Sequence, residues 1–206
     1  VGLGSSANSA LQGLKRTRQQ TGQTNERLST GLRINDPLDG TQDFFASQAL
    51  TNRAADLTQV KNQVGRAIST IQVAGVGLNA INDLSDQARV VATQARNISD
   101  PTERTRLAEQ FNQIRGQIDS IATNSSFGGT NLIGSSPANL DVALNEDGDS
   151  LTVQGTDSTS AGLGISSRTF GSDADIDAAL AGISRAQAQI RSNSTSLSSS
   201  TIAPVS

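Results

Sequence analysis

The stretch that decides the fold is "LTNRAADLTQVKNQVGRAISTIQVAGVGLNAINDLSDQARVVATQA", which runs from Leu50 to Ala95. Apolar residues recur in it every seven positions, and a second apolar series follows three residues behind the first. A heptad pattern held for this long is typical of a coiled-coil helix, so we expect one unbroken helix. The first series is Leu50, Leu57, Val64, Ile71 and Leu78, and the second is Val60, Ala67, Ala74 and Ile81, continued by Ala88 and Ala95.

Two glycines, Gly75 and Gly77, lie inside this helical pattern. Each costs a helix roughly 1 kcal/mol relative to alanine. They therefore indicate either a bend or a tight contact with a neighbouring element, and the sequence leaves both interpretations open.

Two later segments carry helical patterns that could pack against the first. In "SDPTER", Ser99 to Arg104, Asp100 can cap a helix that begins at Pro101. Ser172 and Asp175 form a second capping signature. The seams of the three helices are expected to meet, and the core and assembly positions we assign are Leu50, Leu57, Val64, Ile71, Leu78, Ile114, Ile118, Ile121, Ile183 and Ile190.

The region between the second and third helices changes its period. Apolar and polar residues alternate from Leu140 and again up to Val153, and "NEDGDS", Asn145 to Ser150, lies between them. This predicts a β-hairpin that docks on the bundle or on a neighbouring subunit. Residues 155–171 are rich in Gly, Ser and Thr and show no period, so we expect an irregular, solvated loop there.

Composition excludes several classes of function. The chain has no Cys and no His, which removes ordinary zinc sites, Ser-His-Asp triads and thiol nucleophiles. Its net charge is −3 and its aromatic content is 2%, which argues against nucleic-acid binding. No apolar run is long enough for a membrane span. We predict no catalytic, cofactor or metal site, and interpret Asp36, Asp39 and Asp43 as a solvated loop.

The start of the chain shows a break in a long helical pattern. Residues 5–28 are periodic but polar along much of the seam, and such a helix is marginal without partners. "ERLSTGLRIN", Glu26 to Asn35, then interrupts the pattern at Gly31, and Pro37 disfavours helix at Asp36. We expect the chain to turn here.

"ERLSTGLRIN" resembles the motif that precedes the long core helix of bacterial flagellins. Four other segments resemble conserved flagellin segments and follow the family's order. They are "ALTNRAADLTQ", the stretch from Ile71 to Asn97, "IDSIATNSSFGGTNLIG" and "DIDAALAGISRAQAQI". The resemblance covers roughly Ser9 to Gly134 and Asp173 to Leu197. The resemblance implies that a spoke joins an inner tube to an outer layer. The spoke residues it implies are Arg27, Leu28, Gly31, Leu32, Arg33, Ile34 and Asn35.

The resemblance also implies a function: a structural, non-enzymatic subunit of the extracellular flagellar filament. Its partners would be other flagellin subunits, an export chaperone, and cap and junction proteins. The expected divisions are an N-terminal helix and spoke (1–34), core helices with a hairpin (35–172) and a C-terminal helix (173–206). The family chain continues well past "TIAPVS", so we expect a truncated or diverged end.

Together these observations predict a mainly α fold, an elongated antiparallel coiled-coil-like bundle with a small β-hairpin region. Two other functions stay open: a hook-filament junction protein, and a surface glycan-binding module, which the low aromatic content disfavours. Some flagellins carry O-linked glycans, so modification of residues 156–169 is the alternative to a plain loop.

Overall fold

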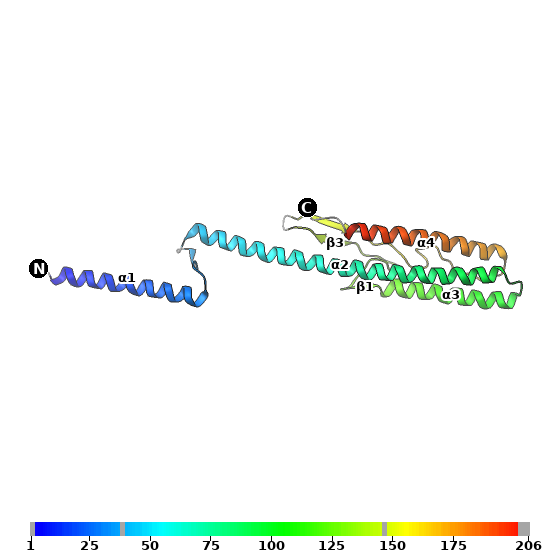
Figure 1. The fold of residues 1–206 in the computed structure, drawn as a ribbon, viewed down its shortest axis with the longest axis horizontal. Helices are drawn as coiled ribbons and strands as arrows, with labels where there is room; N and C mark the ends of the chain where they lie inside the picture. Colours follow the sequence, from blue (N-terminus) through cyan, green and yellow to red (C-terminus); the bar gives the residue numbers. More distant parts are fainter. Residues whose placement is uncertain (1–2, 38–39, 146–147, 202–206) are drawn as a thin grey trace. The chain divides into compact units, whose positions relative to one another are not determined.

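The computed structural model describes residues 3–37, 40–145 and 148–201 (Figure 1). Asp39, part of "NEDGDS" and the segment 202–206 lie outside the described residues. The chain divides into two units, Val1–Asp56 and Leu57–Ser206, which are described separately. The predicted mainly α class is confirmed, with helices α1 (Leu3–Thr30), α2 (Thr41–Arg96), α3 (Pro101–Asn124) and α4 (Asp173–Thr201).

The heptad segment forms a single helix, as predicted, because α2 runs unbroken through Leu50 to Ala95. Most of the buried residues of α2 have small side chains. They belong to the second heptad series or lie next to it on the helix. Small side chains allow α3 and α4 to pack closely on either side of α2. The buried residues of α2 are Ala67, Thr70, Ala74, Gly77, Leu78, Ile81, Ser85, Ala88, Val91, Ala92 and Ala95.

The predicted caps begin the two shorter helices. The Asp100 carboxylate accepts from the backbone N–H of Thr102 at 2.8 Å, and Pro101 takes the first helical position. The Glu103 carboxylate, in the first turn of α3, accepts a hydrogen bond from Arg106. At the start of α4, the Ser172 hydroxyl accepts from the backbone N–H of Asp175.

Ion pairs join the ends of all three helices of the second unit; we call Arg96, Arg104, Asp173 and Asp177 the end clamp. Arg96, the last residue of α2, donates to Asp173 at 2.7 Å and to Asp177 at 2.8 Å on α4. Arg104 of α3 donates to Asp173 at 2.7 Å. Since these contacts bring the end of α2 to the starts of α3 and α4, both shorter helices run antiparallel to α2 (Figure 1).

The clamp also explains how far along α2 the helices α3 and α4 cover it. Helix α4 has 29 residues, so from Arg96 it reaches back only to about position 68 of α2. Leu78, Ile114, Ile118, Ile183 and Ile190 are accordingly buried, and Val64, Ile71 and Ile121 are partly buried. Leu57 is 48% exposed and Leu50 is 68% exposed. Their place in a seam therefore stays a prediction that concerns contacts outside this chain.

The two glycines of α2 differ in their surroundings. A Cβ at Gly77 would lie 2.4 Å from the Ser125 hydroxyl and 2.7 Å from Cδ1 of Ile133, whereas a Cβ at Gly75 would meet nothing within 4 Å. Gly77 is thus the tight contact that the sequence left open, and it lets the end of α3 approach α2.

The predicted hairpin is present and packs on the bundle. Strands β3 (Leu140–Ala143) and β4 (Ser150–Val153) are antiparallel, with Leu140 opposite Val153. The side chains of Val142 and Val153 are buried. A second hairpin, of β1 (Ser126–Phe127) and β2 (Thr130–Asn131), was not predicted. Its turn is formed by Gly128 and Gly129, which both have positive φ.

We call residues Gly155 to Phe170 the strap. One prediction for this segment is wrong. They contain no strand or helix, as expected, but they are not a solvated loop. Ser158, Thr159, Ser160, Leu163 and Ile165 are buried, and the strap runs along the helices to the start of α4 (Figure 1). Buried hydroxyls are poor acceptors of glycans, so the exposed candidates that are left are Ser166, Ser167 and Thr169.

One face of α3 holds the strap through side chains spaced at helical intervals. Asn112 accepts from the Arg168 backbone N–H at 3.1 Å and donates to the Arg168 carbonyl at 2.8 Å. Arg115 donates to the carbonyl of Ile165, and Asp119 accepts from the backbone N–H of Ser160 at 2.7 Å. These bonds satisfy backbone groups that the lack of regular structure would otherwise leave unpaired.

The strap ends at a strained and buried residue. Phe170 has φ +55°, which is uncommon for a residue other than glycine. Its ring packs on Phe111 with centroids 5.3 Å apart, and its backbone N–H donates to Asp175 at 2.8 Å. Burial raises the pKa of Asp175, but hydrogen bonds from Arg168, Phe170 and Thr169 outweigh this and lower that pKa overall.

The contrast between the glycines gives a first prediction. Gly77→Ala should lower the free energy of unfolding by about 1–3 kcal/mol, because the added methyl forces Ser125 and Ile133 to shift. Gly75→Ala should raise it by about 0.5–1 kcal/mol through helix propensity alone. Urea unfolding followed by circular dichroism measures both, and equal effects of the two substitutions would contradict the tight contact.

The end clamp gives a second prediction. The hydrogen bond from Arg104, aided by the charges of Arg96 and Arg104, lowers the pKa of Asp173. A carboxylate with a lowered folded pKa stabilises the fold above its ordinary pKa, and this stability is lost as the pH falls through the folded value. Asp173→Asn should therefore lower the melting temperature at pH 7 and show a smaller further loss between pH 5 and about pH 2.

The matched control for the clamp is Asp83→Asn, which removes an exposed carboxylate of α2 away from it. Its melting temperature should follow the wild-type pH profile. Identical acid profiles for Asp173→Asn and the wild type would contradict the role given to Asp173.

Candidate assembly surfaces

The first unit is built without a core. None of its described residues whose exposure is defined, 4–37 and 40–56, is buried. Yet it presents large apolar side chains to solvent. Burying one such side chain contributes about 1.5–3 kcal/mol, so these residues represent unused stabilisation. The exposed large apolar residues of this unit are Leu11, Leu14, Leu28, Leu32, Phe45 and Leu50.

The predicted break in the first helix is confirmed at Gly31. Helix α1 ends at Thr30, and Gly31 takes φ +69°, with its N–H donating to the Arg27 carbonyl at 2.9 Å. The Thr30 hydroxyl accepts from the N–H of Leu32. A residue with a side chain would be strained at this φ, which explains why glycine ends the helix here.

The remaining motif residues connect the turn to the start of α2. Arg33 donates to Asp43 at 3.4 Å, and the Asn35 side chain donates to the Leu32 carbonyl at 3.4 Å. Ile34 is partly buried and lines an open depression with Leu50 and other residues of α2. The predicted spoke residues thus form one local turn, while their role as a spoke between layers stays a prediction.

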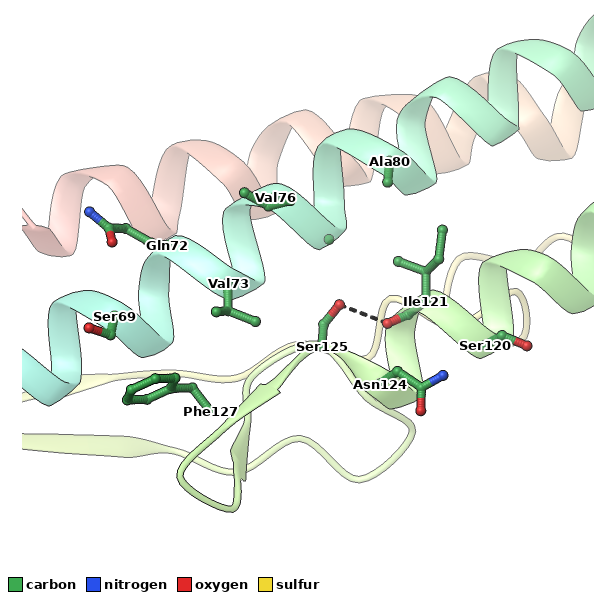
Figure 2. Close-up of a pocket in the computed structure, with 11 residues that line it drawn as sticks. Ser69, Gln72, Val73, Val76, Ala80, Ser120, Ile121, Asn124, Ser125 and Phe127 are labelled. Atoms are coloured by element: carbon green, nitrogen blue, oxygen red, sulfur yellow. Dashed lines mark hydrogen bonds between the residues drawn. The ribbon is translucent and has the colours of Figure 1, made fainter.

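The second unit carries an open groove between α2, the end of α3 and β1, with a cavity volume of about 540 Å³. Figure 2 shows Val73 and Ile121 pointing into the space between the two helices, with Phe127 beside it. The groove arises because α3 ends at Asn124 whereas α2 runs on. Val76 is 69% exposed and Phe127 is 40% exposed. The groove is lined by Ser69, Gln72, Val73, Val76, Gly77, Ala80, Ser120, Ile121, Asn124, Ser125 and Phe127.

Sequence reasoning did not find this groove. Val73 and Val76 are off the heptad seam, and Phe127 lies in the hairpin that was not predicted. The paired glycines after Phe127 were the available signal, since a two-residue turn with positive φ at both positions favours a hairpin. The groove itself depends on where α3 ends against α2, which is a tertiary property.

Two kinds of feature are absent from the described residues. They contain no group of three or more acidic residues placed to hold a metal ion, and no helix among them combines the length and apolarity of a membrane span. What the two units offer instead is exposed apolar helix surface. These features define the class: a mainly helical protein with exposed apolar helix surfaces that suit association with other protein chains.

Comparison with known proteins identifies the family. Residues 4–136 match the family described as the bacterial flagellin N-terminal helical region. The chain belongs to the bacterial flagellin family.

Individual relatives agree with this assignment. The chain is 30% identical to flagellin FljK of Caulobacter vibrioides over 157 residues, which cover 76% of this chain and 58% of that protein. It is 29% identical to a flagellin of Clostridium tyrobutyricum over 142 residues, 68% of this chain and 38% of that protein. The chain thus spans less than two thirds of the length of these relatives. A crystal structure of Bacillus cereus flagellin shares the fold, with a TM-score of 0.59 and 21% identity, over 67% of this chain and 81% of that one.

The division between buried and exposed heptad positions gives a third prediction. Ile118→Asp should lower the melting temperature of the second unit by at least about 10 °C, because it buries an unpaired charge worth several kcal/mol. Leu57→Asp should change it by less than about 2 °C, since Leu57 is half exposed in the single chain. Calorimetry of the two variants at a concentration where the protein is monomeric makes the comparison; a large loss for Leu57→Asp would show that Leu57 packs within the chain.

Proposed function

We propose that this chain is a structural subunit of the flagellar filament, which assembles outside the cell as a helical polymer of identical copies. Membership of the flagellin family supports this function. Because the chain spans only part of its relatives, filament formation by this chain is a proposal. In such a polymer each copy meets the next through two different surfaces, so that the contacts do not close into a ring.

The observation that carries the proposal is that no described residue of the first unit is buried, from 4 to 37 and from 40 to 56. A helix as polar as α1 is marginal in water when nothing packs on it, and α1 has no buried residue among those described from position 4 on. Leu11 and Leu14 lie close together on this helix. Leu50 and Leu57 continue the heptad of α2 into the part that α3 and α4 do not cover. Contacts with other copies would bury these leucines and would stabilise the first unit.

The turn that begins at Gly31 fits the same function. As a spoke it would carry the chain from an inner layer of α1 helices to an outer layer of bundles. Its local bonds, from Gly31 to Arg27 and from Arg33 to Asp43, would define the direction in which the chain leaves α1. In the same proposal Arg27, Leu28, Leu32, Ile34 and Asn35 are spoke residues.

Other partners and the alternative functions rank lower. An export chaperone, cap proteins and junction proteins are further expected partners, on family grounds alone. The relatives reported above are named flagellins, which favours a filament subunit over a hook-filament junction protein. A glycan-binding module would need aromatic platforms, and the groove contributes only Phe127.

Electron microscopy of the concentrated, purified chain, with and without filament seeds, tests the proposal. We expect filaments for the wild type and for Leu57→Met, which keeps an apolar side chain of similar volume. Leu57→Asp should raise the concentration needed for assembly by at least about tenfold, because a buried contact would have to desolvate a carboxylate.

The thermal stability of the single chain is the control in this experiment. Leu57→Met and Leu57→Asp should both melt near the wild type, so that a loss of assembly reports on contacts between copies. A wild-type chain that stays monomeric at every concentration, even with seeds, would refute the proposed function.

A further inference from the structure

The groove lies on the longest uncharged part of α2. From Ala67 to Asn82 this helix carries no Asp, Glu, Lys or Arg, and no charged residue lines the groove. In a chain with 17% charged residues, a neutral surface that also exposes Val76 and Phe127 is suited to a neutral protein surface. A charged peptide would lose hydration there without gaining a partner.

A second neutral surface lies on the other side of α2. Helix α4 carries no charged residue after Arg191, and its exposed side chains there are small and hydroxyl-bearing. In Figure 1, α3 and β1 lie on one side of α2 and α4 lies on the other. We call Ser192, Thr195, Ser198 and Ser199, which are all exposed, the serine face.

The three groove hydroxyls, and those of Thr195, Ser198 and Ser199 on the serine face, are already hydrogen-bonded within their own helices. In the groove, Ser69, Ser120 and Ser125 donate to carbonyls four residues earlier, at 3.1, 2.9 and 2.7 Å. On α4, Thr195 and Ser198 donate in the same way at 2.9 and 2.8 Å. Figure 2 shows the bond from Ser125 to Ile121.

These internal bonds change the cost of burying the two surfaces. A buried hydroxyl without a partner costs about 1–3 kcal/mol, but a hydroxyl that keeps its own bond does not lose that amount. Both surfaces can therefore be covered by protein without leaving these donors unsatisfied. The small side chains of the serine face also let a helix approach the groove closely, so that Val76 and Phe127 become covered.

We propose that the groove of one copy receives the serine face of α4 of a second copy. The inference rests on the proposed function, which supplies a high local concentration of identical chains, and it names a surface pair for one of their contacts. Because the two surfaces lie on opposite sides of α2, the contact is heterologous and leaves a free groove and a free serine face on every pair. It joins copies side by side.

Disulfide trapping tests the contact directly, since the chain has no cysteine of its own. Full-length Val76→Cys and Thr195→Cys proteins are mixed under assembly conditions and oxidised, and the mixed disulfide is measured by mass spectrometry. We expect at least tenfold more of this product than from Val76→Cys mixed with Thr105→Cys. Thr105 is the matched control, because it is also an exposed helical threonine that donates to the carbonyl four residues earlier.

A second pair of variants separates the groove from the fold. Val76→Asp should raise the concentration needed for assembly by at least tenfold, whereas Val76→Thr, which has nearly the same shape and no charge, should change it less than threefold. Both should melt within about 2 °C of the wild type, because Val76 is largely exposed in the single chain.

The outcomes distinguish the groove contact from filament formation. Filaments with equal yields of the two mixed disulfides overturn the groove contact and leave the proposed function intact. Selective trapping of Val76→Cys with Thr195→Cys without filaments supports the contact and refutes the filament function. Equal yields without filaments overturn both.

Discussion

The structure depends on close packing against the small-residue face of α2. Ala74, Gly77, Ala88 and Ala95 of that face are buried, and Gly77 has no space for even a methyl group. Close approach of α3 and α4 follows from these small side chains, with larger residues such as Leu78 and Ile118 filling the space between them. Where the end of α3 meets Gly77, the chain turns into the β1–β2 hairpin, and this turn leaves the groove beside it.

The end clamp and the helix lengths then decide which half of the heptad is covered. With the starts of α3 and α4 held at Arg96, a helix of 29 residues covers α2 only to about position 68. The same apolar period therefore serves two purposes along one helix. From Ala67 onward it forms the core of the single chain, and before that point its leucines are exposed and, in the proposed function, would pack against other copies.

The sequence was sufficient for features with a local or periodic signal. The heptad predicted α2, Asp100 and Ser172 predicted the helix starts, and alternation predicted the β3–β4 hairpin. The strap could not be predicted, because its order comes from Asn112, Arg115 and Asp119, whose partners lie 41–56 residues away in the chain. Phe170 likewise takes its left-handed backbone only because Phe111 and Asp175 hold it. The groove depends on the same kind of long-range placement.

Surfaces of different chemistry respond differently to their surroundings. The end clamp consists of partly exposed ion pairs, which salt screens and acid weakens. The groove and the serine face carry no charge, so a contact between them would depend on apolar burial and be nearly independent of ionic strength. Such a contact is weak for each pair of copies, since the apolar area on one side is small. Repetition along the proposed polymer would add these contributions, whereas in the single chain the serine face, Val76 and Phe127 stay exposed.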